Sequence, residues 1–136
     1  MKKQNGQVIV EFALILPLFL LMIFGLIYSG MLFHDYSTVS NMARSAAREA
    51  AIMQGTSYDG IKTYYIGQGQ GLLTNLYETD SFDIKKGKED NNDNEVYVNI
   101  TMKRNFSFPL IDIVLPEKFG IDYYMRKDQI IQTTSP

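Results

Sequence analysis

Few side chains in this sequence have the types and spacing that catalysis requires. His34 is the only histidine, and the chain contains no cysteine. A general base, a nucleophilic triad or a zinc site would need a second group to act with this histidine. We therefore expect His34 to be a polar residue at a membrane interface, and we expect no enzymatic activity, no metal and no cofactor.

One acidic segment imitates part of a calcium-binding loop. Asp90, Asn92 and Asn94 have the spacing that opens such a loop. Glu95, however, stands where the loop needs glycine, and Thr101 stands where it needs the closing glutamate. The segment is therefore predicted to be a solvated turn.

Three glycines alternate with glutamines in residues 67–71, GQGQG. A phosphate-binding loop would follow an apolar strand and would lead into Lys-Ser or Lys-Thr, and this segment does neither. The cluster therefore predicts a flexible hinge between short helices.

Glu11 is the carboxylate that most needs an explanation. Three apolar residues precede it, and a long uncharged run follows it. An ionised carboxylate at the centre of a membrane helix costs about 2.5–3.5 kcal/mol on insertion scales. Glu11 must therefore either lie at the level of the lipid headgroups or have a partner of opposite charge.

The element that positions Glu11 is long enough to cross a bilayer. Residues 12–33 contain no charge, and a helix of that length spans about 33 Å. Lys2 and Lys3 precede the run and Asp35 follows it, so the positive-inside rule places the N-terminus in the cytoplasm. A cleaved secretory signal would have a shorter apolar core and a small-x-small site. We therefore expect a retained, single-pass transmembrane helix.

The same helix is predicted to continue beyond the membrane. Arg44, Arg48 and Glu49 lie away from an apolar stripe with spacings of three and four, which consists of Val39, Met42, Ala43, Ala46, Ala50 and Met53. The first stop signal is Gly55, so the helix would be about 70 Å long. Since no core of this chain could cover that length, lipid or neighbouring subunits must cover its N-terminal half.

The rest of the chain reads as a small soluble module. Residues 57–66 and 71–79 predict short helices, and residues 81–85 and 120–125 predict strands. Residues 95–104 alternate most regularly, with an apolar face made of Val96, Val98, Ile100 and Met102. Pro109 favours a bend or an edge segment at residues 106–115. The predicted fold class is α+β: a long N-terminal transmembrane and amphipathic helix with a small antiparallel sheet of about three strands packed on its outer half.

Composition limits the partners of this module. A length of 136 residues fits one unit, and the absence of cysteine excludes disulfides. Thirteen basic and fifteen acidic residues give a net charge of −2. There is no basic surface for a polyanion, so we expect no nucleic-acid partner.

The N-terminal residues resemble a known family. Residues 6–12, GQVIVEF, are similar to the processing and assembly motif of type IV pilins and pseudopilins, in which a basic leader ends in glycine and a glutamate stands at mature position five. Over about the first fifty residues the chain resembles the TadE-like proteins of the tight-adherence (Flp) pilus system. The residues in register are Gly6, Gln7, Glu11, Phe12, Ala13 and Pro17. Near the C-terminus, Asp128 departs from the family's Met-Arg-x-Glu ending.

The resemblance implies a division of the chain into a prepilin leader (residues 1–6), a transmembrane helix (7–35), its extramembrane continuation (36–54) and a small α+β outer domain (55–136). A prepilin peptidase would cleave between Gly6 and Gln7. Glu11, with the adjacent Phe12, would set the assembly register by neutralising the new amine of a neighbouring subunit. Pro17 removes a backbone donor and favours a helix kink.

The function implied by the resemblance is that of a minor pilin or pseudopilin, because the major pilins of this system are much shorter. Its partners would be the prepilin peptidase, other pilins and pseudopilins, the pilus assembly platform and the lipid bilayer. It would lie in the bacterial cytoplasmic (inner) membrane, with the C-terminal domain outside, or be incorporated into an extracellular pilus. The alternative is a single-pass, membrane-anchored binding or adhesion module that does not polymerise.

Overall fold

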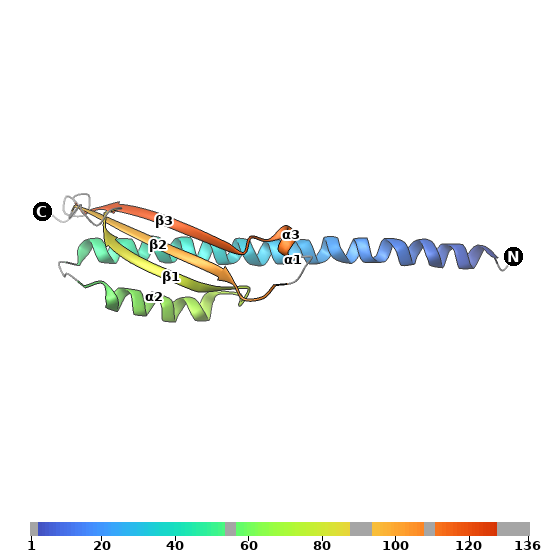
Figure 1. The fold of residues 1–136 in the computed structure, drawn as a ribbon, viewed down its shortest axis with the longest axis horizontal. Helices are drawn as coiled ribbons and strands as arrows, with labels where there is room; N and C mark the ends of the chain where they lie inside the picture. Colours follow the sequence, from blue (N-terminus) through green and yellow to red (C-terminus); the bar gives the residue numbers. More distant parts are fainter. Residues whose placement is uncertain (1–2, 54–56, 88–93, 108–110, 128–136) are drawn as a thin grey trace, which may run out of the picture.

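The computed structural model describes residues 3–53, 57–87, 94–107 and 111–127. In chain order its elements are α1 (Lys3–Ile52), α2 (Asp59–Leu72), β1 (Tyr77–Lys86), β2 (Glu95–Arg104), α3 (Ile111–Val114) and β3 (Lys118–Arg126). The strands form one antiparallel sheet in the order β1-β2-β3. The sheet and α2 lie along the C-terminal half of α1, while the N-terminal half extends beyond them (Figure 1). The predicted α+β arrangement is confirmed.

The long helix α1 has two environments. It is continuous over 50 residues and passes through Pro17. Residues 6–22 are all exposed, whereas the C-terminal half alternates between buried and exposed positions. By length and composition, the N-terminal half could cross a membrane. The predicted end of the helix near Gln54 and Gly55 lies outside the described residues.

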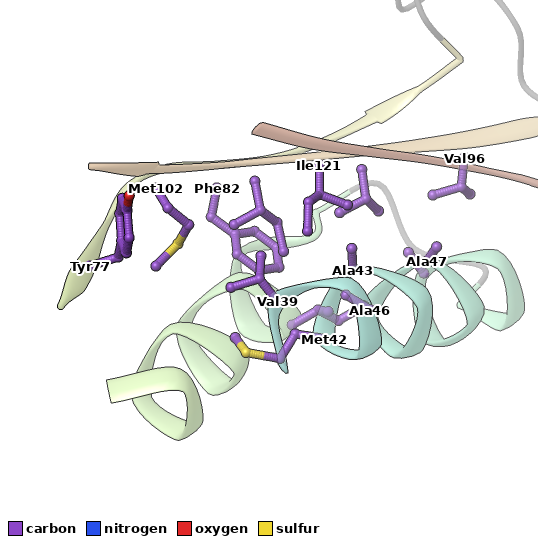
Figure 2. Packing of buried hydrophobic residues seen from close by; sticks show 14 of the residues in the cluster. Val39, Met42, Ala43, Ala46, Ala47, Tyr77, Phe82, Val96, Met102 and Ile121 are labelled. Atoms are coloured by element: carbon purple, nitrogen blue, oxygen red, sulfur yellow. The ribbon is translucent and has the colours of Figure 1, made fainter. Parts of the chain in front are cut away.

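The core lies between the sheet and the C-terminal half of α1 (Figure 2). The predicted inward face of β2 is confirmed, because Val96, Val98, Ile100 and Met102 are fully buried. On α1 the buried stripe matches the prediction except at two positions. Ala47 is buried, whereas Met53 is exposed because it lies beyond the last residue of the helix.

The predicted glycine hinge is wrong. Residues 67–71 lie inside α2, which is one helix through the whole GQGQG segment. Gly69 is buried, and a Cβ atom added there would lie 2.7 Å from Cε of Met42 on α1. The glycine therefore permits close contact between the two helices.

The chain after α2 also differs from the prediction of a helix at residues 71–79. The helix ends at Leu72 and β1 begins at Tyr77. Between them Asn75 has a φ of 65°, a left-handed conformation that asparagine tolerates in turns. This turn reverses the chain, so Leu76 and Tyr77 enter the core.

The other strands agree closely with the sequence pattern. β2 has the predicted bounds, and β3 extends slightly beyond the predicted 120–125. Val98 lies opposite Ile84 on β1 and Tyr123 on β3. The connection between β2 and β3 contains the short helix α3. Pro109, Asp128 and the calcium-like residues Asp90 and Asn92 lie outside the described residues.

Candidate functional site

The N-terminal half of α1 carries every residue singled out by the sequence motif. Gly6, Gln7, Glu11, Phe12 and Pro17 are all exposed and lie in consecutive turns of this helix. Large apolar side chains surround them on every side, and Leu14 is 73% exposed. A surface this apolar over its whole circumference is unfavourable in water and needs lipid or other helices around it. The site is thus an exposed helix surface that is suited to packing.

Glu11 is the one charged residue within this apolar surface. In the described part of the chain it has no hydrogen bond and no ion pair. The described residues therefore leave the carboxylate without compensation, which is costly wherever water is excluded. Lipid headgroups, water or another chain could each supply a partner that the described residues lack.

Gly6 and Pro17 are both exposed among the described residues. A Cβ atom added at Gly6 would meet no atom within 4 Å, so the described structure itself gives no reason for glycine. Pro17 lies inside α1, where its ring leaves the carbonyl of Ala13 without an N–H donor. The predicted kink and the cleavage and register roles remain predictions.

We call the exposed N-terminal half of α1 the bare helix. The junction between the bare helix and the outer domain is built around Asp35. Its side chain is fully buried and accepts two hydrogen bonds from Thr74, one from the backbone N (2.9 Å) and one from Oγ1 (2.8 Å). Nδ1 of His34 lies 3.5 Å from Oδ1 of Asp35, and the imidazole is more than half exposed. These bonds attach α1 to the turn that precedes β1. The sequence pattern predicts Asp35 only as a flanking charge, and no local signal indicates this role.

A second polar centre, Arg104, organises the connection between β2 and β3. Its guanidinium is buried and donates from Nε to the carbonyl of Phe106 (2.8 Å) and from Nη1 to the carbonyl of Leu115 (2.9 Å). Nη2 donates to the carboxylate of Asp112, which also accepts a hydrogen bond from Ser107. The arginine therefore holds α3 in place, and no sequence motif predicted this.

Tyr77 strengthens the same end of the domain. Its ring packs edge-on against Phe119, and its hydroxyl donates to the carbonyl of Pro116 at 2.7 Å. Burial raises the pKa of the Tyr77 hydroxyl, and the positive charge of Arg104 opposes part of this shift. The hydroxyl therefore remains a hydrogen-bond donor at neutral pH.

The described residues contain no group of three or more His, Cys, Asp or Glu side chains that could hold a metal ion. Asn94 is the only member of the calcium-like triad within the described residues, and it is exposed.

Comparison with known proteins gives one match. Residues 6–48 match the model of a family described as TadE-like protein, and this segment includes all the motif residues and most of α1. Searches of curated proteins and of solved structures give no significant match. The apolar helix and the matched family together fit a membrane-anchored protein associated with the tight-adherence pilus. The resemblance inferred from the sequence is thus confirmed: over the helix that carries the candidate site, this chain is similar to the TadE-like proteins.

Proposed function

We propose that this protein is a minor pilin or pseudopilin that a prepilin peptidase processes and that takes part in assembly of a tight-adherence (Flp) pilus. The observation that carries the proposal is the bare N-terminal half of α1, in which residues 6–22 are all exposed and Glu11 is their only charged residue. This half is unsuited to water, and its neighbours in a membrane or a filament would have to be apolar as well. The outer domain covers only the other half of the helix.

Processing would explain Gly6. The described fold does not require glycine at this position, because no described atom lies within 4 Å of an added Cβ. A peptidase that binds an extended backbone in a tight site would instead require the residue without a side chain. Cleavage after Gly6 would create a positively charged amine at Gln7.

Assembly would explain Glu11. In the membrane or the core of a filament, the amine of a neighbouring subunit would supply the opposite charge that Glu11 does not find among the described residues. A wrong register would leave one of the two charges unpaired. The pair would therefore select the correct register among apolar contacts that differ little in energy.

The first test is the mass of the mature N-terminus, measured on membranes from cells with and without the prepilin peptidase. We expect the wild type to begin at Gln7 only when the peptidase is present, and Gly6→Leu to keep residues 1–6. Gly25→Leu is a matched control, because Gly25 lies in the same helix and an added Cβ there also meets nothing within 4 Å. A wild type that keeps its leader, or a trimmed Gly6→Leu, would favour the plain membrane anchor of the alternative function.

The second test separates insertion from assembly. Glu11→Ala should insert and be cleaved as well as wild type, because a charge has been removed from an apolar segment. Incorporation into pili should fall by about 100-fold or more, since breaking a buried ion pair costs about 3–5 kcal/mol. Glu78→Ala removes the same charge from an exposed position in the outer domain and should assemble normally. Normal piliation by Glu11→Ala would mean that the carboxylate is only interfacial.

A further inference from the structure

The most exposed large hydrophobic side chain among the described residues belongs to the outer domain. Ile113 in α3 is 82% exposed, more than any leucine or phenylalanine of the bare helix. Its neighbour Leu115 is buried in the core. The connection between β2 and β3 therefore points one apolar side chain inward and presents another outward.

Hydrogen bonds fix the segment that carries Ile113. Arg104 binds the carbonyl of Leu115 and the carboxylate of Asp112, on either side of Ile113. Tyr77 holds the next carbonyl, that of Pro116. Since Asp112 is paired with Arg104 and Ser107, it adds no unpaired charge beside the isoleucine.

The segment lies at the end of the outer domain that is nearest the bare helix (Figure 1). Phe106, at the same end, is partly exposed, and its ring centroid lies 6.3 Å from that of Tyr28 on α1. Tyr28 lies inside the uncharged run of residues 12–33. The domain therefore begins before the apolar part of the helix has ended.

The length of the bare helix places this end at the lipid boundary. A hydrocarbon layer of about 30 Å takes about 20 helical residues. Twenty residues counted from Val8 end at Ile27, and twenty counted from Phe12 end at Met31. Both placements bring Tyr28 and the adjoining Phe106 to the outer interface, where aromatic side chains are favoured.

We infer that the outer domain rests on the outer leaflet of the bilayer through a lipid-facing rim, formed by Phe106 and Ile113. The occupant of this surface is lipid, because the rim continues the apolar surface of the bare helix. Ile113 inserts at the boundary between headgroups and acyl chains. The inference rests on the membrane anchoring that is part of the proposed function.

The chain contains no tryptophan, so a single introduced tryptophan reports its own surroundings. We would place the full chain, at one copy per disc, in nanodiscs of phosphatidylcholine and phosphatidylglycerol with brominated acyl chains. The probe at the rim is Ile113→Trp, and Phe106→Trp is a second probe of the same rim. Phe19→Trp in the bare helix controls for membrane insertion, and Tyr124→Trp on the outward face of β3 controls for an aqueous position.

We expect bromolipid to quench the fluorescence of Ile113→Trp. The emission of Ile113→Trp should lie at shorter wavelength than the emission of Tyr124→Trp. Only aqueous acrylamide should quench Tyr124→Trp. Quenching of Phe19→Trp without quenching of either rim variant would overturn the inference and leave the anchoring intact. Absence of quenching in Phe19→Trp would contradict the anchoring itself. The tryptophan of Ile113→Trp could instead be shielded from water only when a disc holds several copies of the chain. That result would assign the rim to a neighbouring subunit and would also overturn the inference.

Discussion

The N-terminal half of α1 exposes the largest apolar side chains of the helix, whereas the C-terminal half buries the smallest. Leu14 and Phe12 are exposed, while Ala43, Ala46 and Ala50 have no exposed surface. Both halves belong to one continuous helix. Burial along this helix therefore depends on what lies beside each half and cannot be read from hydrophobicity alone.

The covered half needs small residues because the sheet approaches it closely. Val96 of β2 and Ile121 of β3 lie on the side of the sheet that faces Ala43 and Ala47 (Figure 2), and all four are buried. A larger side chain on α1 would push the sheet away. The bare half has no such partner in the chain, so its large side chains remain available for lipid tails or other helices.

The largest effect is expected from a charge on the inward face of the sheet. Val98→Asp places an unpaired carboxylate in the core and should cost more than about 4 kcal/mol, enough to unfold the outer domain. Thr101→Asp, on the opposite face of the same strand, should change stability by no more than about 1 kcal/mol. Urea unfolding of the full chain in detergent, followed by circular dichroism, measures both. Equal sensitivity of the two faces would contradict the sheet register.

The next prediction exchanges the side-chain sizes of the two halves. Ala46→Leu should destabilise the outer domain by about 1–3 kcal/mol, because the sheet cannot move without losing contacts. Leu18→Ala, in the bare half, should leave the same unfolding transition within about 0.5 kcal/mol of wild type. If Ala46→Leu were neutral, close approach of the sheet would not be the reason for the alanines.

The boundary between the halves can be tested at Asp35. Asp35→Ala leaves the part-buried backbone N–H of Thr74 without its acceptor, which should cost about 1–3 kcal/mol. Asp35→Asn keeps one acceptor oxygen for this N–H and should cost less. Hydrogen exchange at Thr74 would report the loss directly, and unchanged protection in Asp35→Ala would refute the role of this carboxylate.

The smallest effect is expected at Tyr77. Tyr77→Phe removes the hydrogen bond to Pro116 and should cost about 0.5–1.5 kcal/mol at neutral pH. Burial raises the pKa of the Tyr77 hydroxyl from its ordinary value of 10.0. As the pH rises, the unfolded chain therefore loses this proton before the folded chain does. The free energy of unfolding should fall as the pH rises above the tyrosine pKa of the unfolded chain.

Tyr77→Phe should make this alkaline decline shallower. It should not abolish the decline, because burial also raises the pKa of Tyr65 and Tyr97. Denaturant midpoints measured from about pH 8 to about pH 11, a range that brackets the ordinary tyrosine pKa, check the sign. A variant with the wild-type slope would mean that Tyr77 does not contribute to the alkaline decline.

Periodicity was enough to predict the features that depend on one element at a time. The alternation in residues 95–104 predicted both the bounds of β2 and its buried face. The length of the uncharged run predicted the bare helix, whereas the site indicated by the spacing of Gly6 and Glu11 stays a prediction. In each case the signal lies within a few adjacent turns or strand positions.

Features that depend on distant residues could not be predicted in this way. Asp35 is buried because Thr74, 39 positions later, returns to it. The GQGQG segment has the local preferences of a hinge, yet it is helical, and Gly69 within it is buried close to the end of the Met42 side chain on another helix. No partner of Glu11 lies in the described part of the chain, so the described fold gives no direct sign of the partner that the proposed assembly role requires.

The attachment at Asp35 has a geometric consequence for the whole molecule. Because Asp35 is fixed to the turn before β1, α1 cannot rotate about its own axis relative to the sheet. Glu11 lies 24 residues before Asp35 on the same helix, which is about six and two-thirds turns at 3.6 residues per turn. In a straight helix the two carboxylates therefore point in directions that differ by about 120° around the axis of α1. A contact that orients Glu11 also determines the direction in which the outer domain faces, some tens of ångströms away.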